Sequence, residues 1–427
     1  MNSTQAILSK LKSGTYDALF QQLYGADAVE AQRNRYIEAV NSYTALYGEE
    51  DDLWIFSAPG RTEIGGNHTD HNHGCVLAGS VNLDVIAVAA PTAEATICIK
   101  SAGYDIDVID LMDLKVNETE YNRSVSLIRG VADRFCQLGY TVSGFRAYTT
   151  SNVLKGSGLS SSAAFEVLVG TILSHMFNDG SVNPIEIAKI AQYAENVHFG
   201  KPCGLMDQMA SSVGGIIAID FDNPGEPIIK TVDFDFAQSG HRLCIVDVGG
   251  NHADLTHEYA SITTEMKKIS EELGVSFLRD TSFEKLLPKI PSLRTKHGDR
   301  AILRALHFLG DNQRVEKEVS ALEKGDFEAF KQLVIESGHS SFEYLQNIYT
   351  SLAVEHQEVS LALALAQRVL NKKGAWRVHG GGFGGTTQNF VPEELVGEFT
   401  ETMEAVFGKG SCHILSIRPI GGVCVSK

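Results

Sequence analysis

One segment of the chain concentrates side chains that could do chemistry. The sequence "SAPGRTEIGGNHTDHNHG", residues 57–74, holds one arginine, one glutamate, one aspartate, three histidines and four glycines. Three interpretations are open: a metal site, a solvated loop, or a pocket for a ligand rich in hydroxyl groups. The H-x-x-H spacing of His68 and His71 suits a metal-binding pair on a helix, but the glycines make a helix unfavourable here.

A second segment, "NVLKGSGLSSSAAFEV" at residues 152–167, reads as a strand, a glycine–serine turn and the start of an apolar helix. It is not a dinucleotide fingerprint, because Ser161 stands where the third glycine would be, and it lacks the Gly-Lys-Ser/Thr of a Walker A loop. Glycines before a helix N-terminus nevertheless favour phosphate binding, and a serine hydroxyl can join a Mg²⁺ shell. A plain serine N-cap on an ordinary helix is equally open.

Two further segments complete the set of candidates. Residues 379–385, "HGGGFGG", place five glycines between apolar flanks, which indicates a tight turn against a ligand or another loop. In "KPCGLMDQ", Pro202 and Gly204 end a helix shortly before Asp207. An aspartate beside Gly, Leu and Met is expected to be partly buried and to need a cationic partner, for which Arg61 is a candidate.

The chain has 427 residues, which is too long for one ordinary core. Apolar periodicity predicts helices within residues 1–50, short strands from residue 53 to 111, helices near 123–138, 163–177 and 184–198, and long helices over 252–371. The last part is again rich in strands. The pattern predicts an α+β fold with a helical extension at 1–50, one domain at 51–237 and a second at 238–427.

Composition excludes several classes of protein. The net charge of −17 argues against nucleic acid or an anionic membrane as a partner. No run of about 18 apolar residues predicts a membrane span, and the N-terminus lacks a secretory signal. The seven cysteines include no C-x-x-C pair, which is typical of free thiols in a reducing cytoplasm. No obligate protein partner is evident, so small molecules are the expected partners.

Taken together and in this order, the four segments resemble the motifs of the GHMP kinase family, and within it those of the galactokinases. "GRTEIGGNHTDHNHG" resembles the galactokinase signature, "GSGLSSSAA" the phosphate-binding loop, "CGLMDQ" the segment with the catalytic aspartate, and "HGGGFGG" the third motif. The resemblance implies an N-terminal domain like ribosomal protein S5 domain 2, a ferredoxin-like C-terminal domain, and transfer of the ATP γ-phosphoryl to the 1-hydroxyl of galactose with Mg²⁺. A sugar has many donors and acceptors, so a dense polar segment suits its pocket.

The resemblance also implies roles for individual residues. Asp207 would be the catalytic carboxylate and Arg61 its partner, which stabilises charge on the phosphoryl group. The phosphate-binding residues would be Gly156, Ser157, Gly158, Leu159, Ser160 and Ser161. The Mg²⁺ ligands would be Ser162 and Glu195. The sugar-binding residues would be Asn67, His68, Asp70, Gly204 and Tyr259.

The chain departs from the family pattern at the sugar site. The family has glutamate at the position of Asn67, where it contacts the sugar 6-hydroxyl, tyrosine at His71 and threonine at His379. Two like charges about 4 Å apart repel by roughly 4 kcal/mol at an effective dielectric near 20, so loss of a carboxylate would open the pocket to galacturonate or another C6-modified hexose.

Two further functions are compatible with these residues. One is a sensor that binds galactose and ATP without turnover, although the presence of both Asp207 and Arg61 argues against it. The other is a metalloenzyme that uses the three histidines of residues 68–73. If the segment binds a sugar, His71 and His73 are expected to be peripheral.

Overall fold

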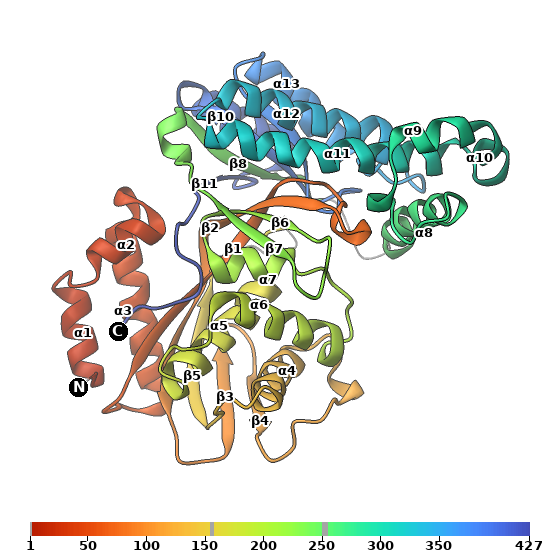
Figure 1. Ribbon diagram of the computed structural model, residues 1–427. Helices are drawn as coiled ribbons and strands as arrows, with labels where there is room; N and C mark the ends of the chain where they lie inside the picture. The colour runs from red at the N-terminus through yellow and green to blue at the C-terminus, as the bar shows by residue number, and fades with distance from the viewer. Residues whose placement is uncertain (1, 154–157, 250–254) are drawn as a thin grey trace.

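The computed structural model describes residues 2–153, 158–249 and 255–427. Gly156 and Ser157, two of the predicted phosphate-binding residues, lie outside these ranges. The described chain forms two sheets with their covering helices, one above the other in Figure 1.

The first sheet is built mainly from the N-terminal half of the chain. Within the described residues it has eight strands, in the order β12-β1-β2-β5-β3-β4, and β6 pairs with both β2 and β7. The strands are β1 (Trp54–Gly65), β2 (Cys75–Pro91), β3 (Thr96–Ser101), β4 (Ile106–Asp110), β5 (Phe145–Ser151), β6 (Ile216–Asp220), β7 (Ile228–Val232) and β12 (Val423–Cys424).

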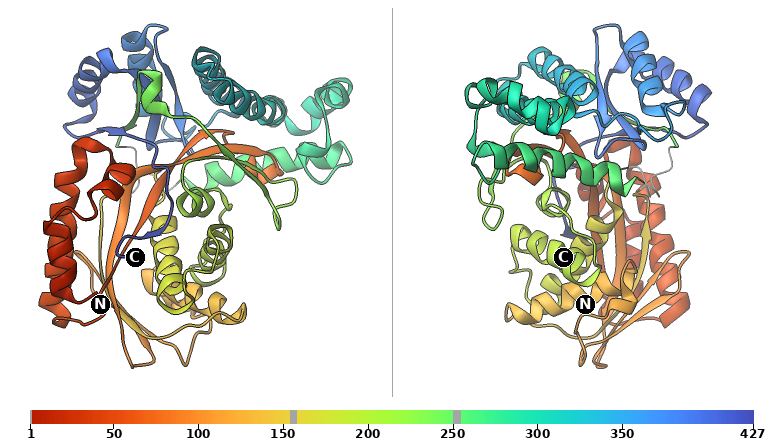
Figure 2. Two further views of the ribbon diagram at one scale, coloured as in Figure 1. Left: turned by 60° about the vertical axis from the view of Figure 1, so that its left-hand side comes forward. Right: turned by 90° about the vertical axis from the view of Figure 1, so that its right-hand side faces the viewer.

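Helices cover both faces of this sheet. One face carries α4 (Ser124–Gln137), α5 (Ser161–Phe177), α6 (Pro184–Tyr193) and α7 (Met206–Val213), and the other carries α1 (Thr4–Lys12), α2 (Asp17–Tyr24) and α3 (Val29–Tyr47), as Figure 2 shows. Along β2, Ile86 and Val88 join the core with α1–α3, while Ala87 and Ala89 join the core with α5. Because side chains alternate between the two faces, a strand buried on both sides reads as a continuous apolar run.

The second sheet has the order β11-β8-β10-β9, and all of its pairs are antiparallel. Its strands are β8 (His241–Asp247), β9 (Ala375–His379), β10 (Thr386–Pro392) and β11 (Cys412–Leu415). Helices lie between β8 and β9, and α14 (Val396–Phe407) lies between β10 and β11. A β-α-β-β-α-β chain in this spatial order is the ferredoxin-like arrangement that the sequence predicts.

The helices inserted between β8 and β9 are longer than a ferredoxin-like domain requires. They are α8 (Thr256–Glu272), α9 (Phe283–Leu286), α10 (Ile290–His297), α11 (Asp299–Glu323), α12 (Phe327–Ser340) and α13 (Glu358–Leu370). Helix α11 contacts both β1 and β2 of the first sheet. Through α11 and α12 the insertion therefore joins the two sheets, while α9 and α10 project to the side in Figure 1.

Two features of the strands differ from the sequence interpretation. Strand β1 runs to Gly65 and is buried almost throughout, whereas the apolar pattern predicts a strand only over residues 53–60. The polar residues Arg61 to Glu63 are accommodated in it because each finds a buried partner. Strand β12 pairs with Phe56 and Ser57 of β1. The last strand of the second predicted domain, residues 238–427, therefore lies in the sheet of the first domain. No helix of the described residues is long and apolar enough to cross a membrane.

Candidate active site

Arg61 connects the elements of the site. It lies on β1, is 6% exposed, and forms a bidentate pair with Asp207, with Nε to Oδ1 and Nη2 to Oδ2 both at 2.7 Å. Its Nη1 donates to the carbonyl of Gly158, and its backbone N–H donates to the carbonyl of Leu159 at 3.1 Å. Bidentate arginine–carboxylate pairs fix both distance and orientation. The guanidinium therefore holds the end of the serine turn and the carboxylate in one rigid unit.

Asp207 lies in the first turn of α7, where the helix dipole favours a negative charge. Burial raises the pKa of its carboxyl, but the charge of Arg61 and hydrogen bonds from Arg61 and Ser160 outweigh burial and hold that pKa below the usual value. The Asp207 side chain is 30% exposed and lines a cavity. Asp207 is therefore an ionised carboxylate at neutral pH that a ligand in the cavity can reach.

The serine turn ends at the N-terminus of α5. Gly158 has φ +70° and Ser160 has φ +53°, both in the left-handed region. Ser160 occupies the N-cap position of α5, but its hydroxyl donates to Asp207 and makes no cap hydrogen bond. The interpretation of this serine as an ordinary N-cap is therefore wrong. The unpaired N–H groups at this helix start stay available for an anion.

A cavity of about 1020 Å³ joins these parts. Ser160, Ser161 and Asp207 line one side of it, and the loop between β9 and β10 lines the other. Cavities of this size hold drug-sized ligands. Because one wall comes from each sheet, a ligand in the cavity would contact both halves of the molecule.

Ser162 and Glu195 supply oxygen atoms on the wall nearest α5. Ser162 Oγ lies 3.4 Å from Glu195 Oε1, and Gln208 Nε2 donates to Glu195 Oε2 at 2.7 Å. Glu195 belongs to a π-helical turn, Ala194–His198, a feature often found at functional sites. One hydroxyl and one carboxylate suit Mg²⁺, which takes few protein ligands and completes its shell with water and phosphate oxygens.

The predicted sugar-binding residues hold the glycine-rich loop. Asn67 Nδ2 donates to the carbonyl of Gly380 at 2.7 Å, and Tyr259 Oη donates to that of Gly382 at 2.9 Å. His68 Nε2 lies 2.9 Å from the Gly381 carbonyl, so that nitrogen carries the proton. Burial lowers the pKa of the His68 imidazole to about 4, and the ring is neutral. Three successive carbonyl groups of this loop thus accept hydrogen bonds from side chains of two separate regions of the chain, residues 67–68 and residue 259.

The Asn67 side chain is enclosed by other protein groups, which the sequence interpretation does not anticipate. It is 0% exposed, and its Nδ2 also donates to Glu63 Oε1 at 3.0 Å. Its Oδ1 accepts from Asn347 Nδ2 at 2.8 Å and from Ser341 Oγ at 3.2 Å. A side-chain amide can donate two hydrogen bonds and accept two, so every donor and acceptor site of the Asn67 amide is already used. Its predicted contact with a sugar hydroxyl would require one of these bonds to break.

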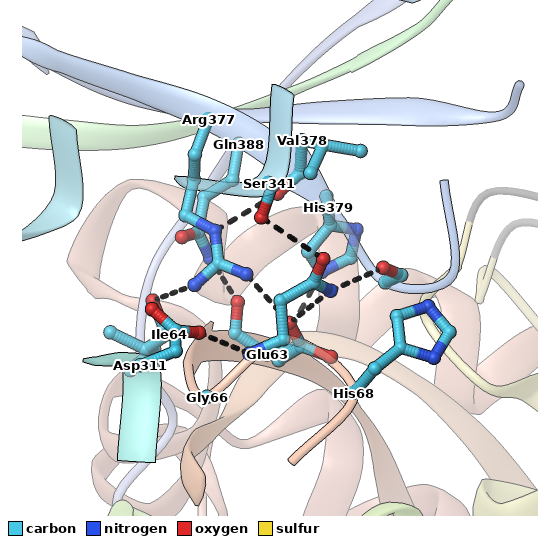
Figure 3. A network of polar contacts seen from close by, with 12 residues as sticks. Glu63, Ile64, Gly66, His68, Asp311, Ser341, Arg377, Val378, His379 and Gln388 are labelled. Carbon is cyan, nitrogen blue, oxygen red and sulfur yellow. Dashed lines mark hydrogen bonds and ion pairs between the residues drawn. The ribbon is translucent and has the colours of Figure 1, made fainter. Parts of the chain in front are cut away.

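The structure places two buried ionisable groups beside Asn67. Glu63 on β1 lies next to the amide, and Arg377 Nη2 on β9 donates to its carboxyl group at 2.7 Å, as Figure 3 shows. Burial raises the pKa of Glu63 to about 7 against the opposing effect of Arg377. The effect of Asn67 on the choice between galactose and a uronate stays a prediction.

Asp70 and Gly204 lie against each other. A Cβ at Gly204 would come within 2.5 Å of Asp70 Oδ2, so a larger residue at 204 would displace the carboxylate. Asp70 lies in a short 3-10 turn and keeps 18% of its side-chain exposure. The structure therefore brings together two of the predicted sugar-binding residues from segments far apart in sequence.

The histidines that depart from the family pattern have different surroundings. His71 is among the residues that line the cavity, and its side chain is 45% exposed, whereas the His73 ring stacks on Phe277 with centroids 3.5 Å apart. His379 is 2% exposed, and its Nε2 accepts from the backbone N–H of Glu63 at 3.3 Å. Its Nδ1 therefore donates to Thr386 Oγ1 at 2.9 Å. No cluster of three or more His, Cys, Asp or Glu side chains in the described chain is placed to hold a metal ion.

Two residues of the site escape the sequence interpretation. Lys201 lines the cavity beside Glu195, and Glu63 supports Asn67. The signal for Lys201 is a basic residue between Gly200 and Pro202, directly before the segment of Asp207. Nothing in the spacing of Glu63 distinguishes it from an exposed residue of the same segment.

Comparisons with known proteins define the class first. Residues 126–215 match the model described as "GHMP kinases N terminal domain", and residues 41–91 match the "Galactokinase galactose-binding signature". A solved Lactococcus lactis galactokinase complexed with galactose shares the fold with a TM-score of 0.75, 22% identity, and coverage of 90% of this chain and 98% of that one. A solved mevalonate kinase aligns with a TM-score of 0.60 and 15% identity, over 85% of this chain and 98% of that one. The fold is that of the GHMP kinases.

Curated relatives identify the family within that class. A galactokinase from Streptomyces coelicolor is 30% identical over 370 residues, which are 86% of this chain and 91% of the relative. A galactokinase from Mannheimia succiniciproducens is 31% identical over 365 residues, 83% of this chain and 89% of the relative. The chain belongs to the galactokinase family.

Proposed function

We propose that the protein transfers the γ-phosphoryl group of ATP to the anomeric 1-hydroxyl of galactose. The observation that carries this proposal is the Asp207 carboxylate, which is held by Arg61 in a bidentate pair and lines the same cavity as the serine turn at the start of α5. Membership of the galactokinase family supports both the reaction and the sugar. The enzyme is proposed to be cytoplasmic, because its cysteines are free thiols.

In the proposed reaction, a bond forms between the sugar O1 and the γ-phosphorus while the bond from that phosphorus to the ADP oxygen breaks. Asp207 orients the 1-hydroxyl and accepts its proton. Arg61 stabilises the negative charge on the transferring group and keeps Asp207 in place. Positioning and electrostatics carry most of phosphoryl transfer, so a rigid pair of this kind is the feature the reaction needs.

The phosphates are proposed to lie over the N-terminus of α5, held by the backbone of residues 156–161 and by the Ser160 and Ser161 hydroxyls. Ser162 and Glu195 would hold Mg²⁺, which neutralises phosphate charge when it is bound with the nucleotide. The hydrogen bond from Gln208 to Glu195 Oε2 leaves Oε1 facing Ser162 and supports that assignment.

The sugar is proposed to bind between Asp70, the backbone at Gly204, His68 and Tyr259. For Asn67 the contacts favour a different role, in which the amide holds the glycine-rich loop against β1 and so shapes the pocket without touching the sugar. Galactose rather than a uronate is the expected substrate because the chain belongs to the galactokinase family and matches its galactose-binding signature.

A panel of sugars with ADP release as the readout tests the proposal. We expect turnover with galactose, and at least about tenfold lower kcat/KM with galacturonate and with glucose, because each leaves polar groups of the site unpaired. Turnover of galacturonate without turnover of galactose would overturn the choice of sugar. Binding of both ATP and galactose with no ADP release would instead identify a sensor.

A further inference from the structure

Lys201 lies in the loop between the π-helical turn and α7 and has no part in the motifs or in the proposed reaction. Among the described residues that line the cavity, it is the one lysine or arginine. Its backbone N–H donates to the carbonyl of Glu195 at 3.2 Å, so the loop places its side chain next to that carboxylate. Its Nζ lies 3.5 Å from Glu195 Oε1.

The contact between Lys201 and Glu195 is loose. The lysine side chain is 63% exposed, while that of Glu195 is 4% exposed. Exposed ion pairs at such distances contribute little, because the flexible side chain loses entropy and water screens the charges. The ammonium group can therefore leave Glu195 for a stronger anion in the same cavity.

The other charged side chains of this wall of the cavity already have hydrogen-bond partners. Asp207 is bonded to Arg61, and the buried Glu166 and Glu195 share Gln208 Nε2, at 3.2 and 2.7 Å. Glu195 Oε1, which faces Ser162, is the atom that Lys201 contacts. A divalent cation at this oxygen would repel the ammonium group, and a polyphosphate beside it would attract the ammonium group.

We propose that Lys201 is a nucleotide-binding residue that occupies Glu195 in the ligand-free protein and moves to a phosphate oxygen when ATP and the divalent cation enter. The inference rests on the proposed function only in taking ATP as the ligand. Lysine binds phosphate as a mobile point charge with rotatable donors, which suits an exchange between two anions. Glu195 would then exchange its ammonium partner for a metal ion, so that its carboxylate would keep a positively charged partner.

The test uses the full chain with Lys201→Met and Lys201→Arg, and Lys267→Met as the matched control. Lys267 is another exposed lysine, which lines the neighbouring cavity rather than this one. Calorimetry of MgATP binding without sugar avoids turnover. A lost charge-assisted hydrogen bond is expected to raise Kd at least about tenfold in Lys201→Met, and Lys201→Arg and Lys267→Met are expected to stay within about threefold of the unmodified protein.

A second readout separates nucleotide binding from a merely structural role. Binding of Mn²⁺ alone, followed by electron paramagnetic resonance, is expected to become a few-fold tighter in Lys201→Met because the competing ammonium group is gone. An unchanged Kd for MgATP in Lys201→Met would overturn the proposal even if galactose is turned over. If no sugar is phosphorylated but MgATP binding still depends on Lys201, the proposed function fails and this inference stands.

Discussion

The two ends of the cavity satisfy their polar groups in different ways. At the phosphoryl end, Arg61, Asp207 and Ser160 form a charged unit on the first sheet and its helices. At the sugar end, the neutral side chains of His68 and Tyr259 bond to backbone carbonyls of the loop between β9 and β10. Arg61, Asp207 and Ser160 thus hold one another in place through their own hydrogen bonds. A sugar, by contrast, has to replace hydrogen bonds that the protein makes with itself.

The carboxyl groups show the same contrast. The pKa of Asp207 is held below its usual value by Arg61 and Ser160 despite burial. Behind the sugar end, burial raises the pKa of Glu63 to about 7 and that of Glu318 to about 8. One end therefore keeps its negative charge at neutral pH, whereas the other carries protons there. Three substitutions sharpen or break this comparison.

The largest effect is expected at the phosphoryl end, for Asp207→Asn. Loss of the carboxylate that is proposed to receive the sugar proton is expected to lower kcat by about 10²–10⁴-fold. Affinity for MgATP should stay within a few-fold, because Arg61 and the start of α5 remain. ADP release and calorimetry measure the two quantities, and thermal melting controls for the fold. Full turnover in this variant would remove Asp207 from the chemistry.

At the sugar end, Asp70→Ala is expected to raise KM for galactose by about 10–150-fold, the cost of a lost charged hydrogen bond of about 1.5–3 kcal/mol. MgATP affinity should not change, since Asp70 lies beside Gly204 and is proposed to bind only the sugar. Steady-state kinetics check this, with Asp105→Ala, an exposed aspartate before β4, as the control. An equal change in the affinities for both ligands would contradict the separation of the two ends.

The third effect is on stability and leaves the kinetics aside, and it concerns the layer behind the sugar end. Glu318 on α11 is 0% exposed, and neither carboxyl oxygen has a hydrogen-bond partner among the described residues. Its pKa of about 8 in the folded chain lies above the ordinary value of 4.5, so the folded state binds the extra proton between these values. The free energy of unfolding should then fall by up to about 1.4 kcal/mol per pH unit as the pH rises through this window.

Glu318→Gln is expected to remove this slope, because the amide cannot titrate. Urea unfolding at several pH values between 5 and 8 measures it, with the exposed Glu316→Gln on the same helix as the control. The same slope in both variants would show that Glu318 is not the group that takes up the proton.

The parts of this molecule that the sequence predicts are those with a local cause. Helix α5 and the second half of strand β2 follow from apolar patterns. The pairing of Arg61 with Asp207, 146 residues apart, is a long-range exception that follows from the need of a buried carboxylate for a cation. The surroundings of Asn67 have no local cause. Its partners Ser341, Asn347 and Gly380 lie 274, 280 and 313 residues further along the chain. Only the packing of the second domain brings them to it.

Lys201 escapes sequence reasoning for a different reason. Its position depends on the loop that leads from the π-helical turn to α7, and no residue pattern marks that turn. A lysine beside glycine and proline reads as a solvated loop residue, and only the cavity distinguishes it from other exposed lysines.

The pairing of β12 with β1 has a consequence for biosynthesis. The backbone of Ile55 donates to Ser426 Oγ, a partner 371 residues later in the chain. At roughly 5–20 residues per second, β1 waits about 20–75 s on the ribosome before this edge of its sheet can be completed. During that interval the nascent strand needs shielding from other chains. A fusion partner attached after Lys427 without a spacer would hinder closure of this edge.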